Sequence, residues 1–178
     1  MNTPTKRDAF RRLSAIDIAT VIDVGVAAQT ESLIAAYPDA LHLLIEPAIK
    51  WHDTYPQTYA GINYVPHVML ANSINRIDAL TFDGPALLKI DVDGGELAVL
   101  IGSIGILDRV AVIVIEATSD SLCGIVQFAT AHGFRLFDAV ELCYCGNQLH
   151  QCDLLFVAES FCHLVFTPWD IRSYRHFE

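Results

Sequence analysis

The feature that most constrains the fold is a series of short, nearly continuous apolar runs. Two of them, LHLLIEP and VAVIVIEA, show no polar–apolar alternation, which is typical of strands covered by helices on both faces. The runs expected to form strands are Val21–Gly25, Leu41–Glu46, Ala86–Val92, Val110–Ala117, Phe134–Val140 and Asp153–Val157. We therefore expect a mostly parallel sheet with a hydrophobic core on each side.

Segments with helical spacing separate most of these runs. The expected helices are Thr30–Tyr37, Glu96–Leu107 and Ser121–His132. Gly133 follows the last helix, where a left-handed C-terminal cap belongs. The final two runs have no helix between them, and Gly146-Asn147 is suited to a hairpin turn. The predicted fold class is α/β: a doubly wound, Rossmann-like, mostly parallel sheet that ends in an antiparallel hairpin.

The bulk properties exclude several classes of protein. The 178 residues suffice for one domain, expected over residues 1–178 with its core at about 16–159. Hydrophobic residues make up 53% and charged residues 18%, a balance opposite to that of disordered chains. No apolar stretch approaches the roughly 18 residues that span a bilayer, and a net charge of −10 repels phosphate backbones. We expect no nucleic-acid or membrane partner and, with five cysteines and no export signal, a cytoplasmic location.

The loop after the first expected strand, VIDVGVAAQT, has the composition of a ligand-binding turn. Gly25, Ala27 and Ala28 permit a close approach to the backbone. Glu46 ends the next strand 23 positions after Asp23, where an acidic residue grips a ribose diol. A dinucleotide needs G-x-G-x-x-G, and this loop has one glycine. The pattern thus favours a ligand without phosphate, such as S-adenosylmethionine, over the cofactor of a nucleotide-dependent oxidoreductase.

A second acidic cluster stands in LLKIDVDGGELAVL, residues 87–100. Asp91 and Asp93 follow a buried strand, and Glu96 opens the next helix, where its charge suits the helix dipole. Glu116 ends the following strand. Open α/β sheets bind ligands at the carboxyl ends of their strands, so we expect these acids and those of the first loop to share one edge. The alternative is that each only caps a strand or a helix.

These stretches resemble the FkbM family of methyltransferases. VIDVGVAAQTESLIAAYPDALHLLIEP is similar to the family's first motif, and LLKIDVDGGELAVLIGS is similar to its most recognisable one. VIVIEATS and GFRLFDA…CDLLFVAE are similar to its last strands, so the resemblance covers about Ile16–Glu159. It implies a class I methyltransferase fold and methyl transfer from S-adenosylmethionine, usually to a hydroxyl oxygen of a small molecule, a sugar or a natural product.

The resemblance and the loop patterns together assign roles to the residues. Those expected to bind the cofactor are Asp23, Gly25, Ala27, Thr30, Glu46, Pro47, Asn72, Ser73 and Asp91. Asp91 is the first choice for the base or acceptor-orienting group, followed by Glu116 and then Glu96. A divalent metal bound between Asp91 and Glu116 is an alternative that the sequence leaves open, because carboxylates suit hard cations.

Two departures from the family pattern leave a second interpretation open. A glycine usual in the loop is replaced at Ala28 or Gln29, and the stretch from Pro47 to Leu87 is short. Val65–Leu70 is either the third strand, beside the adenine, or a later one. The chain could thus be a degenerate methyltransferase fold that binds the cofactor or a protein partner. The shortened middle should expose an apolar face, which predicts a homodimer.

Two further clusters have plain interpretations. Cys143, Cys145, His150 and Cys152 lie close together, but C-x-C is not the usual zinc spacing and no second pair exists. We therefore expect ordinary cysteines. The basic cluster at the N-terminus, formed by Lys6, Arg7, Arg11 and Arg12, is expected to be a solvated helix face.

Overall fold

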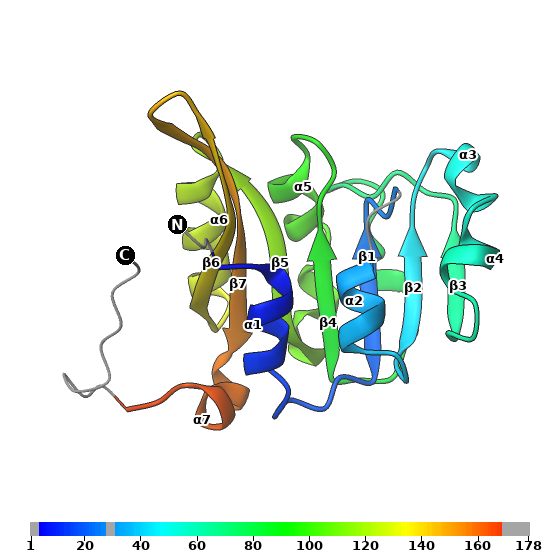
Figure 1. The fold of residues 1–178 in the computed structure, drawn as a ribbon, viewed down its shortest axis with the longest axis horizontal. Coiled ribbons are helices and arrows are strands. Elements are labelled where there is room, and N and C mark those ends of the chain that lie inside the picture. The colour runs from blue at the N-terminus through cyan, green and yellow to red at the C-terminus, as the bar shows by residue number, and fades with distance from the viewer. Residues whose placement is uncertain (1–3, 28–30, 169–178) are drawn as a thin grey trace.

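The computed structural model describes residues 4–27 and 31–168 of the chain (Figure 1). Its strands are β1 (Thr20–Val24), β2 (Leu41–Ile45), β3 (Tyr64–His67), β4 (Ala86–Ile90), β5 (Val110–Thr118), β6 (Phe134–Cys145) and β7 (Gln148–Ala158). Its α-helices are α1 (Lys6–Arg12), α2 (Glu31–Ala36), α3 (Ile49–His52), α4 (Tyr55–Thr58), α5 (Glu96–Ile101), α6 (Leu122–Ala131) and α7 (Cys162–Val165). Short 3₁₀ turns are η1 (Ile77–Ala79), η2 (Ile104–Arg109) and η3 (Glu159–Phe161).

The described strands form one seven-stranded sheet in the order β3-β2-β1-β4-β5-β7-β6. The pairs from β3 to β5 are all parallel, whereas β7 runs antiparallel to both β5 and β6. The strand order reverses between β1 and β4, the position where open α/β sheets form ligand crevices. The expected doubly wound sheet with a final antiparallel hairpin is confirmed.

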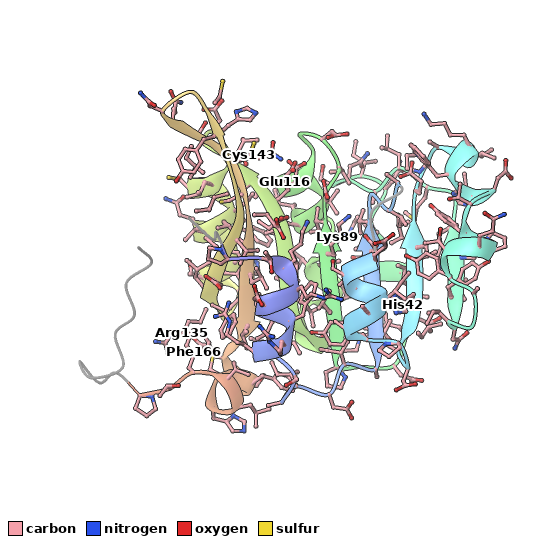
Figure 2. All side chains as sticks on the ribbon, in the orientation of Figure 1. His42, Lys89, Glu116, Arg135, Cys143 and Phe166 are labelled. Carbon is pink, nitrogen blue, oxygen red and sulfur yellow. The ribbon has the colours of Figure 1, made fainter. Side chains whose placement is uncertain are left out.

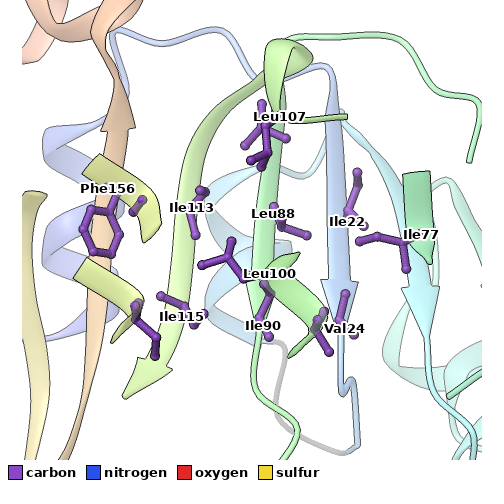
Figure 3. Close-up of a cluster of buried hydrophobic side chains, with 14 of the residues drawn as sticks. Ile22, Val24, Ile77, Leu88, Ile90, Leu100, Leu107, Ile113, Ile115 and Phe156 are labelled. Carbon is purple, nitrogen blue, oxygen red and sulfur yellow. The ribbon is translucent and has the colours of Figure 1, made fainter. Parts of the chain in front are cut away.

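Helices cover both faces of the sheet, as the continuous apolar runs require. In Figure 1, α1 and α2 lie in front of the sheet, and α5 and α6 lie behind it. Ile22, Leu88 and Ile113 pack into the core on the α5 and α6 side (Figure 3). Their sequence neighbours Val21 and Leu87 pack on the α1 and α2 side. Burying each such side chain contributes about 1.5–3 kcal/mol, so successive residues of one strand stabilise two layers.

Three elements differ from the sequence prediction. The hairpin is longer than expected, because β6 and β7 continue to a turn at Gly146, whose φ is +62°. The expected helix Glu96–Leu107 ends at Gly102 and resumes as η2, since glycine weakens a helix interior. Tyr64–His67 pairs with β2. Of the two alternatives for Val65–Leu70, the structure therefore shows the first, in which this segment contributes the third strand of the chain.

Exposed apolar side chains, as expected from the shortened middle, lie on the outer strand β3 and in the segment that follows it. Val65, Val68 and Ile74 are 41%, 60% and 86% exposed. Homodimerisation through this side stays a prediction. We expect light scattering to report about twice the chain mass at micromolar concentration, and Val68→Lys, which places a charge in the interface, to shift it to one. A single-chain mass for the unaltered protein at high concentration would contradict this expectation.

No helix in the described part of the chain has the length and apolar character needed to cross a membrane.

Candidate active site

The carboxyl ends of β1, β2, β4 and β5 meet at one edge of the sheet, where two cavities adjoin. The Glu46 cavity has a volume of about 410 Å³ and lies beyond β1 and β2. The Glu116 cavity has a volume of about 580 Å³ and lies between β5, the β6–β7 hairpin and the two front helices. Asp91 lines both, so one carboxylate stands at the boundary between two potential ligands.

The Glu46 cavity combines an apolar surface with carboxylates. Trp51, Met69 and Leu70 contribute apolar surface, and Glu46, Asp91 and Asp93 contribute the acidic groups; Gly25, Ala27 and Pro47 complete the part of the lining predicted from the sequence. Its volume lies within the range of about 300–1,000 Å³ usual for small-ligand sites. An adenine would fit against the apolar part, and a sulfonium or ammonium group would be attracted to the acidic part.

Glu46 is held in a fixed orientation at this cavity. Its side chain is buried, and its two oxygens accept hydrogen bonds from the backbone N–H groups of Ala48, at 2.8 Å, and Ala27, at 3.3 Å. A carboxylate has about four acceptor positions, so two remain for other donors. That is the arrangement needed to accept hydrogen bonds from a ribose diol.

Gly25 allows two loops to approach each other closely. Its φ is +80°, and a Cβ added there would lie 1.7 Å from the carbonyl oxygen of Asp91. The sequence predicted a close approach of a ligand to this backbone, whereas the structure shows that the Asp91 peptide is the near neighbour. Gly25 thus lines the cavity and also lets the β1 loop pack against the end of β4, which positions Asp91.

Lys89 is a site residue that the sequence analysis missed. Its Nζ lies 3.1 Å from Oδ1 of Asp23 and 3.4 Å from Oδ2 of Asp91, and donates a hydrogen bond of 3.0 Å to the carbonyl oxygen of Gly25. Figure 2 shows it within the sheet, below the edge where Glu116 lies. Burial lowers the pKa of Lys89, but the two carboxylates outweigh this and raise it above its ordinary value. The signal in the sequence was a lone lysine inside the apolar strand LLKI.

Asp23 supports the site from inside the sheet. It has no exposed surface and lines neither cavity among the described residues. Burial raises the pKa of its carboxyl group, and the ion pair with Lys89 opposes that rise. The direct cofactor contact expected of Asp23 stays a prediction; in the structure the residue pairs with Lys89, which in turn pairs with Asp91.

Glu116 lines the second cavity, and the pKa of its carboxyl group is raised. Its Oε1 accepts a hydrogen bond of 2.7 Å from Nε2 of Gln151 on the hairpin. Burial, followed by the charges of Asp91 and Glu96, raises the pKa of Glu116 to about 7. A carboxylate with this pKa exchanges its proton near neutral pH, as a general base must.

Glu96, the third catalytic candidate, is turned into its own loop. It is 3% exposed, and its Oε1 accepts hydrogen bonds from the N–H groups of Gly94, at 2.7 Å, and Val92, at 3.4 Å. Gly94 has a φ of +104°, so Glu96 stabilises a sharply turned backbone beside Asp91. Its placement indicates a structural role in the loop, and it lies in neither cavity lining of the described chain.

Asn72 and Ser73, the residues expected near the adenine, do not line the Glu46 cavity. Asn72 accepts hydrogen bonds of 2.8 Å from the N–H groups of Ile74 and Asn75, so its side chain closes a turn. The preceding residues, Met69 to Ala71, line the Glu46 cavity instead, and Ser73 lies on the exposed turn. Thr30 lies outside the described residues.

The cysteine-rich hairpin gives no metal geometry. Cys143 and Cys145 are exposed, Cys152 is buried, and all are free thiols. Within residues 4–27 and 31–168, no group of three or more His, Cys, Asp or Glu side chains is placed to hold a metal ion.

A match to a known family covers most of the sheet and its carboxyl edge. The methyltransferase FkbM domain matches residues 20–136, about two thirds of the chain. The chain belongs to the FkbM methyltransferase family. The matched segment contains β1, β2, β4 and β5 and thus Glu46, Asp91 and Glu116. Among curated proteins, no sequence matches the chain significantly.

Solved structures show the same fold at low sequence identity. The precorrin-6y C5,15-methyltransferase of Geobacter metallireducens superposes with a TM-score of 0.59 and 16% identity, covering 88% of this chain and 94% of that one. The N-methyltransferase NodS of Bradyrhizobium japonicum gives 0.60 and 11%, covering 86% and 94%. The magnesium protoporphyrin IX methyltransferase of Synechocystis, with bound S-adenosylmethionine, gives 0.56 and 11%, covering 85% and 79%.

S-adenosylmethionine is the cofactor of this FkbM-family protein, and the residues present fit it. The Glu46 cavity offers an apolar surface for adenine, a fixed carboxylate for the ribose and Asp91 and Asp93 for the cationic methionine end. When bound, the cofactor supplies a methyl group already activated on a sulfonium.

Proposed function

We propose that this protein transfers a methyl group from S-adenosylmethionine to a hydroxyl oxygen of a small molecule, a sugar or a natural product. The cofactor would occupy the Glu46 cavity and the acceptor the Glu116 cavity. The observation that carries the proposal is the adjoining pair of cavities that share Asp91, with a carboxylate of pKa about 7 in the second.

The chain's own residues divide the work of the reaction. Glu46 binds the ribose, and the apolar lining binds the adenine. Asp91, whose Oδ2 lies 3.4 Å from Nζ of Lys89, orients the acceptor hydroxyl at the boundary of the cavities, since in-line displacement depends on alignment. Glu116 accepts the hydroxyl proton as the acceptor oxygen bonds to the methyl carbon and the carbon–sulfur bond breaks. The front helices and the hairpin enclose the acceptor.

The alternative function is a degenerate fold that only binds the cofactor or a protein partner. Two adjoining cavities favour an enzyme, because a module that binds only the cofactor needs one. We also propose a reducing compartment, the cytoplasm, because all five cysteines are free thiols.

The cofactor assignment is tested at Glu46. Glu46→Ala should weaken binding of S-adenosylmethionine by about 1–3 kcal/mol, because a ribose diol loses a charged acceptor. Glu46→Gln keeps the shape and should lose less. Isothermal calorimetry measures the affinity of both variants. Glu159→Gln is the control, because this exposed acid lies in η3, at the end of β7 away from the two cavities. Unchanged affinity in Glu46→Ala would remove Glu46 from the cofactor site.

A further inference from the structure

We propose that the acceptor carries a protonated amine beside the hydroxyl that is methylated, so that the substrate class is an amino alcohol or an amino sugar. The inference rests on the proposed function and concerns the charge of the Glu116 cavity. An acceptor must enter this cavity to reach the shared Asp91.

The lining of the Glu116 cavity is strongly acidic. Its charged residues are the acids Glu31, Asp91, Glu116, Glu141 and Asp153 and the base Lys6. Lys6 is already paired with Asp153 at 3.0 Å, and Lys89 from inside the sheet is paired with Asp91. Glu31, Glu116 and Glu141 therefore have no ion pair with any residue that the structure describes. A cation is the ligand that would complete this arrangement.

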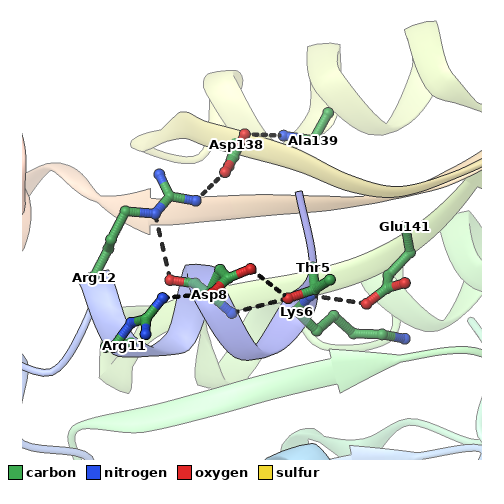
Figure 4. A network of polar contacts seen from close by, with 8 residues as sticks. All are labelled: Thr5, Lys6, Asp8, Arg11, Arg12, Asp138, Ala139 and Glu141. Carbon is green, nitrogen blue, oxygen red and sulfur yellow. Dashed lines mark hydrogen bonds and ion pairs between the residues drawn. The ribbon is translucent and has the colours of Figure 1, made fainter. Parts of the chain in front are cut away.

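Glu141, one of the acids of the cavity lining, is held in place by the N-terminal segment (Figure 4). The N–H of Lys6 donates a hydrogen bond of 2.9 Å to Glu141, and the N–H of Glu141 donates one of 3.0 Å to the carbonyl oxygen of Pro4. Arg12 forms an ion pair with Asp138. The basic cluster expected to be a solvated face thus contributes in part to docking α1 on β6, the strand that carries Glu141.

Glu141 adopts a backbone conformation that residues with a side chain rarely take. Its φ is +52°, at the irregularity in the β6–β7 pairing between Val140 and Cys143. Such strain persists only where the surroundings impose it, and it concentrates at binding sites. Here the irregularity turns a carboxylate into the lining of the cavity.

The charge of the cavity would also favour methylation of the hydroxyl over methylation of the amine. An ammonium group has no lone pair and cannot attack the methyl carbon, so a site that keeps the amine protonated directs the reaction to oxygen. The same ammonium would favour the charged form of Glu116, which is the form that accepts the hydroxyl proton. An acceptor with a carboxylate or phosphate would be repelled. A divalent metal is less favoured than an amine, because no three ligands converge in the described chain.

Matched acceptors test the inference on protein saturated with S-adenosylhomocysteine. The probes are serinol, glycerol and glycerate, and glucosamine, N-acetylglucosamine and glucuronate, measured by calorimetry at pH 7 and followed by labelled methyl transfer. We expect the amines to bind about tenfold or more tightly than the neutral members, the acids not to bind, and added salt to reduce the preference.

A matched pair of variants tests whether the preference for amines depends on Glu141 in the lining of the Glu116 cavity. Glu141→Gln keeps the acceptor for the Lys6 N–H and removes one charge, so the amine-to-neutral ratio should fall about three- to tenfold, whereas Glu159→Gln should leave it unchanged. Amines that bind no better than neutral probes, a ratio unaltered in Glu141→Gln, or magnesium chloride that binds in place of the amine would each overturn the inference. Failure of S-adenosylhomocysteine itself to bind would instead overturn the proposed function.

Discussion

Glu116→Gln should lower the rate of methyl transfer by about 10²–10⁴-fold, the usual cost of removing a general base. Glutamine keeps the shape of the side chain and the hydrogen bond from Gln151, but it cannot take up the proton. Because the pKa of Glu116 is raised to about 7 in the free protein, kcat/KM of the unaltered protein should increase as the pH rises through 7 and level off above it. In Glu116→Gln this pH dependence should disappear.

Cofactor binding separates this effect from damage to the fold. Glu116 does not line the Glu46 cavity in the described chain, so affinity for S-adenosylhomocysteine should stay within about twofold of the unaltered protein. Asp91→Asn should also nearly abolish turnover, but through misalignment, so the residual rate should still rise with pH. The rise should occur at a lower pH than in the unaltered protein, because the charge of Asp91 is one cause of the raised pKa of Glu116. Full activity in Glu116→Gln with the pH profile intact would show that the base lies elsewhere, and a flat profile in Asp91→Asn would assign it to Asp91.

The raised pKa of Glu116 has a second consequence, for stability. Its folded-state pKa exceeds its ordinary value of 4.5, so the folded protein holds the proton more tightly than the unfolded chain. The stabilisation from this group is therefore fully present below about pH 4.5 and is lost as the pH rises through about 7. Glu116→Gln should remove this part of the pH dependence of the melting temperature, so that above pH 7 the variant melts no lower than the unaltered protein.

Lys89→Met should destabilise the protein by about 3–5 kcal/mol, because it leaves Asp23 without its ion-pair partner in a fully buried position. For a chain of this size the melting temperature should fall by about 6–20 °C. The loss should be smaller at low pH, because burial raises the pKa of Asp23 and the protonated, uncharged form tolerates the core.

The double variant Lys89→Met with Asp23→Asn is the matched control. Removing both charges leaves no isolated ion, so much of the stability should return, as it does when buried ion pairs are replaced together. Activity should not return, because Asp91 still lacks its partner Lys89. A Lys89→Met protein that melts at the unaltered temperature would show that the pair contributes little to folding.

Local patterns were sufficient for most of the sheet. The continuous apolar runs placed β1, β2, β4 and β5 within a residue or two, and Gly133, with a φ of +79°, has the left-handed conformation expected after α6. The long hairpin was underestimated because the outer half of β6 is largely exposed, and exposed strands lack an apolar run. The short helix α4 lies in residues 55–75, the stretch of the sequence without a clear hydrophobic pattern, where packing rather than periodicity decides the structure.

For the candidate site, too, the sequence determined some features and the tertiary structure determined the others. The motif LLKID by itself determined that Asp91 stands at the carboxyl end of a buried strand, and the strand ending in Glu46 determined a second acid at the same edge, because side-chain period and strand direction are local properties. Only the tertiary structure decided that Asp23 is enclosed and paired with Lys89. It alone brought Gln151 to Glu116 across 35 positions and Lys6 to Glu141 across 135. Such contacts depend on which strands become neighbours and which helix covers them, and the free energy that selects this arrangement comes from the whole core rather than from any one segment.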